Sequence, residues 1–329
     1  MTPRTSPRWS STWSRARWSA TPWPERGAGA VYCAAVPTAD ALLLAASVVY
    51  GTSYVATRVA LDGVPPSTLA LIRLVVGALV LVPLAARAGA AGRRQPGDTV
   101  RLALMGVIGF AAAFAFGHWG LQRSTATNAA LLIAVEPLTL LVLGPLLLGE
   151  RPSVRERLGG ACALVGAVLV VTDGIPGVTE RLVPHWRGDV LLVLSGVAYA
   201  AYSLLGRPLL ARCPALPVTA HSIVWGIPAL APLALAEWLG GQRPAWTAAS
   251  LAGTVYLAVV ITALGYLVWN WALERVSAAR AGIFINVQPV VGAVLGVAWL
   301  GEPLSAFTIA GGLLVVGGLA LTVKSGAGP

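Results

Sequence analysis

Charged side chains are scarce in this sequence, since Asp, Glu, Lys and Arg make up only 11% of its 329 residues. An ordinary soluble domain carries about 25%. So few charges leave too little polar surface for a water-soluble globule, and they favour a chain solvated by lipid. The net charge of +10 does not indicate a nucleic-acid partner, because most basic residues lie in short segments between apolar runs.

Cysteine and histidine are also rare, with three residues of each. The spacing of Cys33, Cys162 and Cys213 fits neither a metal site nor a disulfide framework, so we interpret them as small apolar side chains. We find no phosphate-binding loop and no clustered nucleophile and base. We therefore expect a protein that is not an enzyme, with no catalytic residues, no metal, no cofactor and no nucleotide-driven activity.

Residues 1–37 differ from the rest of the chain, because they are rich in Arg, Ser, Pro and Trp and show no helical period. We predict a disordered Arg/Trp-rich N-terminal extension, for which an early start codon is an alternative explanation. From residue 38 onward, apolar runs of about 20 residues, the length that crosses a bilayer, alternate with breaks rich in Gly, Pro and Arg. The ten predicted transmembrane helices are 39–60, 67–87, 101–121, 125–148, 155–172, 188–207, 216–236, 249–272, 279–300 and 305–324.

The Lys and Arg residues between these runs predict the orientation of the chain. If the N-terminus is inside, the inner segments hold seventeen of them and the outer segments hold five. Basic residues are enriched in cytoplasmic loops. We therefore predict a multi-pass protein of the cell (inner) membrane with both termini in the cytoplasm.

An internal repeat is the main architectural signal. A shift of 152 residues superimposes residues of the same type in order: Trp119 on Trp271, Arg123 on Arg275, Pro137 on Pro289, Glu150 on Glu302, and Gly159-Gly160 on Gly311-Gly312. Each half has five runs, an odd number, so the second half must enter the membrane from the opposite side. We predict an all-α membrane protein with two inverted five-helix repeats at 38–173 and 187–325, a recurrent design of transporters.

Two segments, Ala129–Ser153 with EPLTLLVLGPLLLGERPS and Ala281–Ser305 with VQPVVGAVLGVAWLGEPLS, share a P…LGE pattern. They resemble the EamA-domain transporter family of the drug/metabolite transporter superfamily, and Val48–Leu61 resembles the opening helix of that family. The resemblance implies a ten-helix carrier, often an exporter of amino acids or other metabolites. It also implies a central cavity lined mainly by the third, fourth, sixth, eighth and ninth helices. The acid Glu136 before Pro137 departs from the commonest pattern.

Glu136 is the sharpest candidate for a substrate- or proton-binding residue. It lies near the middle of its apolar run, where a charge costs several kcal/mol unless it is paired or hydrated. A carboxyl that exchanges its proton as a cavity opens suits proton coupling. The alternative is a protonated side chain that is hydrogen-bonded to a neighbouring helix. Its repeat mate is Gln288, which is polar but cannot titrate.

Each of the further candidates has an alternative interpretation. Pro137 and Pro289 each remove a backbone donor, which predicts either a hinge beside the cavity or a static kink. His118 and Asn270 are repeat mates beside tryptophans, so they are either ligand contacts or interfacial anchors. The candidate aromatic ligand contacts, which are core residues in the alternative interpretation, are Tyr199, Tyr202 and Tyr266.

Arg73, Glu302 and a set of glycines receive weaker interpretations. Arg73 either extends to the interface or attracts anions at a cavity mouth. Glu302 is expected to form a salt bridge or to cap the next helix. Small residues allow close helix packing in lipid, so the glycines of the last run in each half indicate either packing within a monomer or the surface of a homodimer.

These observations predict a secondary transporter. We expect it to export amino acids or other small metabolites by alternating access, with proton coupling as an option. The expected partners are a small-molecule substrate and the lipid bilayer, and the chain is a monomer or a homodimer. The alternatives are a non-transporting membrane scaffold or sensor and an intramembrane enzyme, neither of which would move solute.

Overall fold

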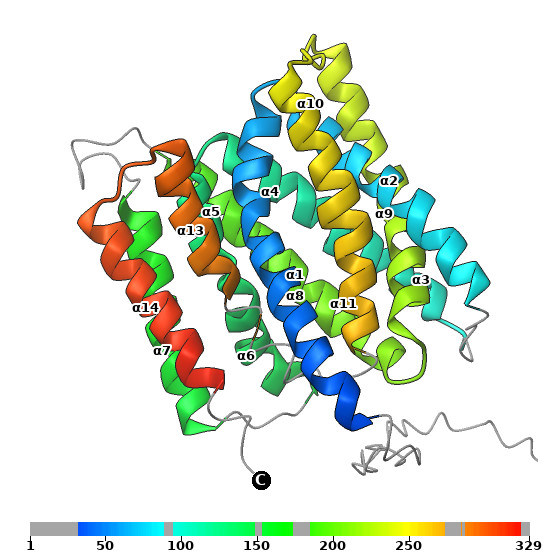
Figure 1. Ribbon diagram of the computed structural model, residues 1–329, viewed down its shortest axis with the longest axis horizontal. Coiled ribbons are helices and arrows are strands. Elements are labelled where there is room, and N and C mark those ends of the chain that lie inside the picture. Colours follow the sequence, from blue (N-terminus) through cyan, green and yellow to red (C-terminus); the bar gives the residue numbers. More distant parts are fainter. Residues whose placement is uncertain are drawn as a thin grey trace, which may run out of the picture.

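The computed structural model describes residues 32–88, 95–148, 153–173, 185–273, 284 and 287–323. All regular secondary structure in these ranges is helical. Figure 1 shows the helices running roughly side by side as a bundle, with the start of α10 at its upper end. The predicted N-terminal extension lies outside the described residues, except that the first helix already begins at Tyr32.

The first half of the chain forms helices up to residue 173. They are α1 (Tyr32–Leu61), α2 (Pro66–Arg87), α3 (Asp98–Leu104), the π-helix η1 (Met105–Ala112), α4 (Ala113–Gln122), α5 (Ala126–Leu132), α6 (Val135–Leu148) and α7 (Val154–Asp173). Local chemistry explains the start of α5, because the Thr125 hydroxyl accepts a hydrogen bond from the Asn128 N–H at 3.0 Å. A side-chain oxygen at this position satisfies one of the free N–H groups of a helix start.

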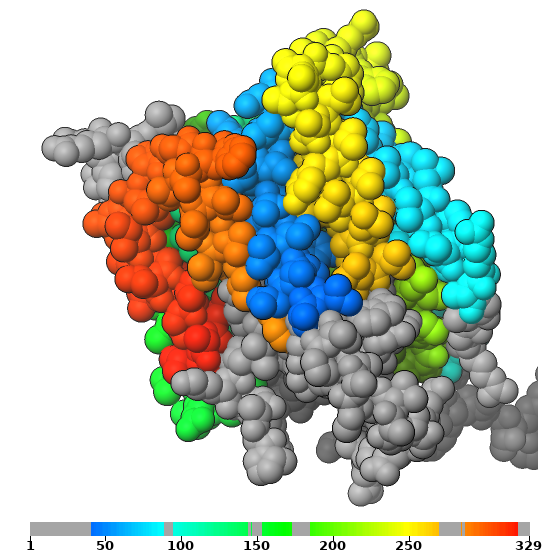
Figure 2. Space-filling model, in the orientation of Figure 1, coloured from blue at the N-terminus to red at the C-terminus, as the bar shows by residue number. Residues whose placement is uncertain are grey.

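The described helices of the second half begin at residue 186. They are α8 (Trp186–Leu210), α9 (Ala215–Leu239), α10 (Ala248–Val255), the π-helix η2 (Tyr256–Leu264), α11 (Gly265–Leu273), α13 (Val287–Leu300) and α14 (Ala306–Val323). Thr247 and Ser250 form a reciprocal capping box at the start of α10. In the space-filling view of Figure 2, α14, α13, α1 and the α10–α11 segment lie side by side on one face.

The surface of the bundle is apolar, as expected for contact with lipid. Leu79, Leu146, Trp299 and Leu313 are all at least 70% exposed. Seven helices in the described part are long and apolar enough to cross a membrane, and Val287–Leu300 and Ala306–Leu321 are shorter apolar helices. The chain is therefore a multi-pass helical membrane protein.

The run at 125–148 is not one continuous helix, because it is divided into α5 and α6 at residues 133–134. Pro137 has no N–H group and cannot donate to the carbonyl of Ile133, four residues earlier. That carbonyl instead accepts a hydrogen bond from the Glu136 N–H at 3.0 Å. The proline thus produces a break in the helix directly beside Glu136.

Glycines of the last run in each half pack within the monomer. Helices α7 and α14 contact each other along their length, and Figure 1 shows them side by side. A Cβ atom on Gly166 would lie 2.5 Å from the carbonyl oxygen of Gly311, and Gly318 similarly faces the Gly159 carbonyl. The backbones approach so closely that only glycine fits at these positions.

Candidate functional site

A cavity of about 360 Å³ lies between helices of both halves of the chain. It is lined from the third, fourth, sixth, eighth and ninth predicted helices, as the resemblance implies, and also from α1 and α2. Six of the seven residues predicted to bind substrate or protons line it: His118, Glu136, Tyr199, Tyr202, Tyr266 and Gln288. The side chain of the seventh, Asn270, lies outside the described residues.

Glu136 reaches the cavity at the break between α5 and α6. The Ser203 hydroxyl of α8 donates a hydrogen bond to one carboxyl oxygen at 3.3 Å. No other hydrogen bond to this carboxyl occurs among the described residues, and the half-buried side chain lines the cavity. The arrangement leaves one carboxyl oxygen free for a proton or a polar group of a ligand.

Gln288 and Pro289 lie in the first turn of α13, whose described part begins at Val287. Pro289 holds the same position in α13 as Pro137 holds in α6, the third residue. The carbonyl oxygen of Gln288 would lie 3.1 Å from a Cβ atom on Gly51, so α1 and α13 pack closely here. Residues 285 and 286, the counterparts of 133 and 134 under the shift of 152, lie outside the described residues, so the hinge at Pro289 stays a prediction.

Arg73 does not extend to the interface. It lies about two turns into α2, is only 8% exposed and lines the cavity. Its Nε donates to the Thr262 hydroxyl of η2 at 3.1 Å, and its Nη1 donates to His118 Nε2 at 3.0 Å. The guanidinium also lies over the ring of Phe114, 4.3 Å from the centroid.

His118 is held in one tautomer by its two neighbours. It is 3% exposed, and its Nδ1 lies 3.0 Å from the carbonyl oxygen of Pro66. Because that carbonyl can only accept, Nδ1 carries the proton and Nε2 accepts from Arg73. His118 is therefore a cavity residue that orients the guanidinium, and not an anchor at the interface.

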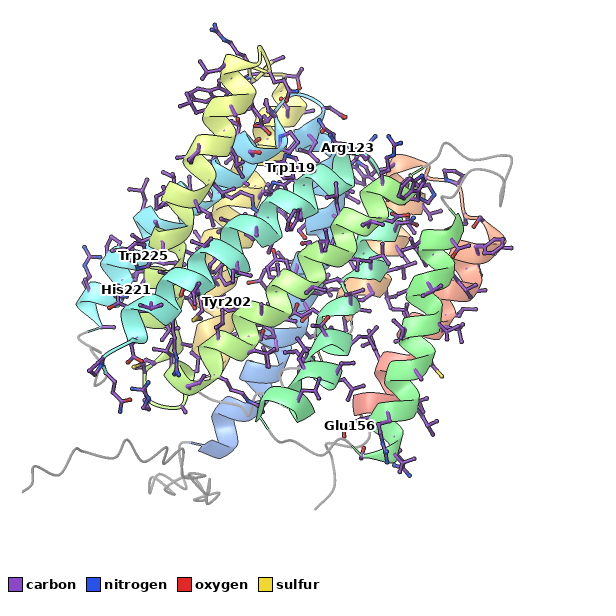
Figure 3. All side chains as sticks on the ribbon, turned by 180° about the vertical axis from the view of Figure 1, so that it is seen from behind. Trp119, Arg123, Glu156, Tyr202, His221 and Trp225 are labelled. Carbon is purple, nitrogen blue, oxygen red and sulfur yellow. The ribbon has the colours of Figure 1, made fainter. Side chains whose placement is uncertain are left out.

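Aromatic rings form the wall next to Arg73. The ring of Phe110 makes edge contacts with Tyr202 at 5.1 Å and Tyr266 at 5.6 Å between centroids. Phe114 makes a similar contact with Tyr199 at 6.3 Å. Tyr202, labelled in Figure 3, belongs to α8, and its ring faces Phe110 of η1. This part of the cavity offers an apolar surface with phenol hydroxyl groups.

One set of cavity residues on α1 was not predicted. Tyr50, Ser53, Tyr54 and Thr57 all line the cavity. Their spacing of three, four and seven residues places them on one helical face. A stripe of polar and aromatic side chains in an otherwise apolar run was the signal that sequence reasoning missed.

Two carboxylates join separate helices at the upper end of the bundle. Glu302, after α13, accepts hydrogen bonds from the Ala126 N–H at 2.6 Å, the Thr127 N–H at 2.8 Å and the Thr127 hydroxyl at 2.7 Å. Glu302 thus caps the start of α5 and not the next helix, α14. The start of α5 presents free N–H groups, and such groups attract and bind an anion.

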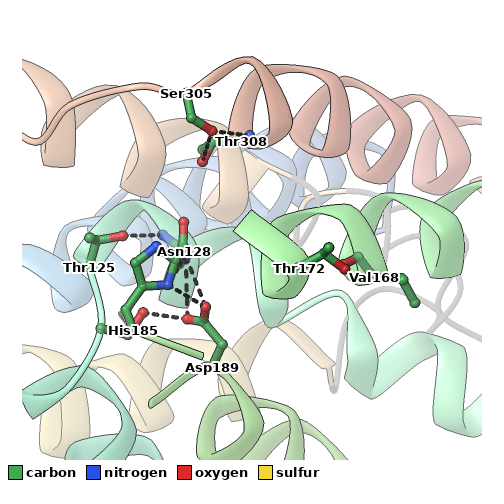
Figure 4. A network of polar contacts seen from close by, with 9 residues as sticks. Thr125, Asn128, Val168, Thr172, His185, Asp189, Ser305 and Thr308 are labelled. Atoms are coloured by element: carbon green, nitrogen blue, oxygen red, sulfur yellow. Dashed lines mark hydrogen bonds and ion pairs between the residues drawn. The ribbon is translucent and has the colours of Figure 1, made fainter. Parts of the chain in front are cut away.

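Glu237 at the end of α9 makes the same set of contacts with the start of α2. Its carboxylate accepts from the Ser67 N–H at 2.8 Å, the Thr68 N–H at 3.0 Å and the Thr68 hydroxyl at 3.1 Å. A third polar group lies nearby, where Asn128 donates to the buried Asp189 at 3.2 Å beside His185 (Figure 4). Several polar contacts therefore hold the helices together at this end.

The fold and the site define a class of protein, a polytopic helical membrane protein with a polar and aromatic cavity between its helices. The EamA-like transporter family model matches residues 37–172 and again residues 186–324. The chain therefore belongs to the EamA-like transporter family. Membership points to a transporter rather than an enzyme.

Individual relatives are named as transporters. A "Probable terminal-alkyne amino-acid exporter" of Streptantibioticus cattleyicolor is 33% identical over 276 residues, covering 83% of this chain and 89% of the relative. A "Probable amino-acid metabolite efflux pump" of Salmonella typhimurium is 25% identical over 297 residues, covering 86% and 93%. A solved crystal structure shares the fold, with a TM-score of 0.60, 20% identity, and coverage of 87% of this chain and 96% of the other.

Proposed function

We propose that this protein is a secondary transporter that exports amino acids or other small metabolites across the inner membrane by alternating access. The observation that carries the proposal is the cavity of about 360 Å³ between the two halves, which holds a carboxyl group with a single hydrogen-bond partner in the described part of the chain. The names of two relatives, an amino-acid exporter and an amino-acid metabolite efflux pump, support the direction and the substrate class.

The proposal includes ten transmembrane helices in two inverted repeats at 38–173 and 187–325, with both termini in the cytoplasm. The positions of the two π-helices support the repeat. Under the shift of 152 residues, η1 at 105–112 falls on 257–264, which coincides with η2 at 256–264. π-Helical turns are rare and occur often at functional sites, so two of them at matching positions favour a common ancestor for the halves.

We further propose that Glu136 couples export to proton movement, with Pro137 as a hinge beside it. A charged carboxylate at membrane depth is costly unless it is hydrated or paired. Glu136 would therefore take up a proton when the cavity closes around it and release that proton when water enters. Ser203 is its only described hydrogen-bond partner, so no fixed cation holds it ionised.

Transport by purified protein in proteoliposomes tests the proposal. Vesicles loaded with an unlabelled amino-acid mixture should accumulate labelled amino acid from outside by exchange, and a pH gradient should accelerate net movement. We expect Glu136→Gln to keep exchange and to lose its dependence on the pH gradient, because an amide cannot carry a proton. Glu156→Gln is the matched control, since Glu156 accepts from the Ser153 N–H at the start of its own helix, α7.

The outcomes separate the alternatives. A membrane scaffold or sensor, like an intramembrane enzyme, would move no solute in these vesicles. If a broad panel of amino acids and small metabolites showed no exchange above protein-free vesicles, the transporter proposal would be wrong. If Glu136→Gln retained the full response to a pH gradient, the coupling role would be wrong and transport would stand.

A further inference from the structure

Among the residues that the structure describes, the buried guanidinium of Arg73 contacts only neutral groups. Thr262 contributes a hydroxyl, His118 contributes a ring nitrogen whose opposite nitrogen donates to a carbonyl, and Phe114 contributes the face of a ring. Among the described residues no carboxylate contacts Arg73. By contrast, Arg212 of this chain pairs with Asp98 at 2.9 Å. Arg73 thus brings a positive charge into the bundle with no carboxylate in contact in the described ranges, and Glu136 lines the same cavity but is hydrogen-bonded to Ser203.

The remaining donors of Arg73 suit a carboxylate. A guanidinium has five N–H groups in a planar fork and cannot lose its charge in a protein. Thr262 and His118 accept from two of these groups, so the others are without an acceptor in the described structure. Two parallel N–H groups match the two oxygens of a carboxylate. Because Arg73 lines the cavity, a bound molecule can supply that carboxylate.

The surroundings of Arg73 select the rest of the ligand. Phe110 and Phe114 are almost completely buried, and they contact Tyr202, Tyr266 and Tyr199 edge to face. This wall presents aromatic carbon beside the charge. It suits a body that is apolar or aromatic and that packs against rings.

We propose that Arg73 anchors the carboxylate group of the transported substrate, so that the cavity takes small carboxylates with an apolar or aromatic body. This inference rests on the proposed function, because it identifies the substrate class of the same cavity. His118 and Thr262 are positioning residues that orient the fork. The bound carboxylate balances the charge of Arg73, and an amide or an amine of the same shape does not.

Binding to the purified protein in detergent tests the role of Arg73. The probes are 3-phenylpropanoate and L-phenylalanine, which carry carboxylates, and L-phenylalaninamide and 2-phenylethylamine, which do not. We expect both carboxylates to bind wild-type protein at least about tenfold more tightly than the other two, since bidentate pairing is lost without a carboxylate. Arg73→Gln should remove this preference. Arg123→Gln is the matched control, because Arg123 is exposed and donates to the Trp119 carbonyl.

Chemical modification keeps the test decisive if Arg73→Gln folds poorly. Phenylglyoxal attacks arginine side chains, and mass spectrometry locates the adduct in wild-type protein. We expect 3-phenylpropanoate to protect Arg73 and 2-phenylethylamine to leave it reactive. The inference is overturned if neither carboxylate binds, if the amide and the amine bind equally well, or if 3-phenylpropanoate gives no protection.

Exchange in proteoliposomes, measured in parallel, separates this inference from the proposed function. If the amide and the amine exchange as fast as the carboxylates, all above protein-free vesicles and in wild type and Arg73→Gln alike, the protein is a transporter and the inference about Arg73 is wrong. If the carboxylates bind through Arg73 and neither they nor any member of the broad panel exchanges faster than in protein-free vesicles, the binding site stands and the transporter proposal is wrong.

Discussion

Replacing Glu302 by Gln should open the upper end of the bundle. The carboxylate accepts three hydrogen bonds of 2.6–2.8 Å from Ala126 and Thr127, and it links the loop after α13 to the start of α5. If transport proceeds by alternating access, these two helices must separate when this end opens. Loss of the link therefore favours the open state.

The size of the effect follows from the geometry. A hydrogen bond to a charged group contributes about 1.5–3 kcal/mol, and the attraction between an anion and a helix start adds about 0.3–1 kcal/mol. Glutamine keeps one acceptor oxygen, and water reaches this half-buried site to replace part of the loss. We therefore expect a shift of about 2 kcal/mol, or about 30-fold in the equilibrium, since about 1.4 kcal/mol is tenfold.

Labelling of a cavity cysteine measures this shift. Ser53 lines the cavity from α1, so Ser53→Cys serves as the reporter in a chain whose Cys33, Cys162 and Cys213 are replaced by alanine. A membrane-impermeant maleimide is added outside intact cells. We expect Glu302→Gln to raise the labelling rate at least tenfold.

The control for this measurement is Glu156→Gln, which removes a cap within one helix and not a link between two. Figure 3 places Glu156 at the far end of α7 from the upper end of the bundle. Its labelling rate should equal that of the reporter alone. If Glu302→Gln lowered the melting temperature and left labelling at the control value, Glu302 would only stabilise the fold and the reasoning about opening would be refuted.

Two further changes test neighbouring conclusions. Glu237→Gln should raise the labelling rate in the same direction, because Glu237 joins α9 to the start of α2 through Thr68 with the same three kinds of contact; an unchanged rate would contradict this. Gly166→Leu should lower the melting temperature, since its Cβ would lie 2.5 Å from the Gly311 carbonyl oxygen and overpacking costs about 1–3 kcal/mol or more. Gly317→Leu, with open space at its Cβ, should melt like the wild type.

Helix positions followed from the sequence because each depends on residues that are close in the chain. The predicted run 216–236 corresponds to α9 at Ala215–Leu239, and 155–172 corresponds to α7 at Val154–Asp173. The break between α5 and α6 was not predicted as a division of the run, although Pro137 was named. Whether a proline bends or breaks a helix depends on what else satisfies the freed carbonyl, here the Glu136 N–H on the carbonyl of Ile133. The π-helices η1 and η2 were missed because an apolar run does not reveal which carbonyl each N–H contacts.

The candidate site was predicted only in part, because the sequence shows which side chains are unusual within one run and not which of them meet. Glu136 and Gln288 were found because a polar residue within an apolar run is conspicuous in the sequence alone. Arg73 is just as conspicuous, yet its position within two turns of a helix end made extension to the interface a reasonable interpretation. Only the neighbouring helices decide whether Arg73 extends to the interface or stays in the cavity, since its partners Thr262 and His118 lie on η2 and α4.

The sequence by itself determined that lipid surrounds this chain, approximately where its helices run and that its two halves are related. These are properties of composition and of local runs, which need no knowledge of which helices touch. Only the tertiary structure decided which side chains share one cavity and which carboxylates join separate helices at one end of the bundle. Arg73 and Thr262 are 189 residues apart in the chain and 3.1 Å apart in space. The free energy of a buried charge depends on such neighbours, and packing alone supplies them.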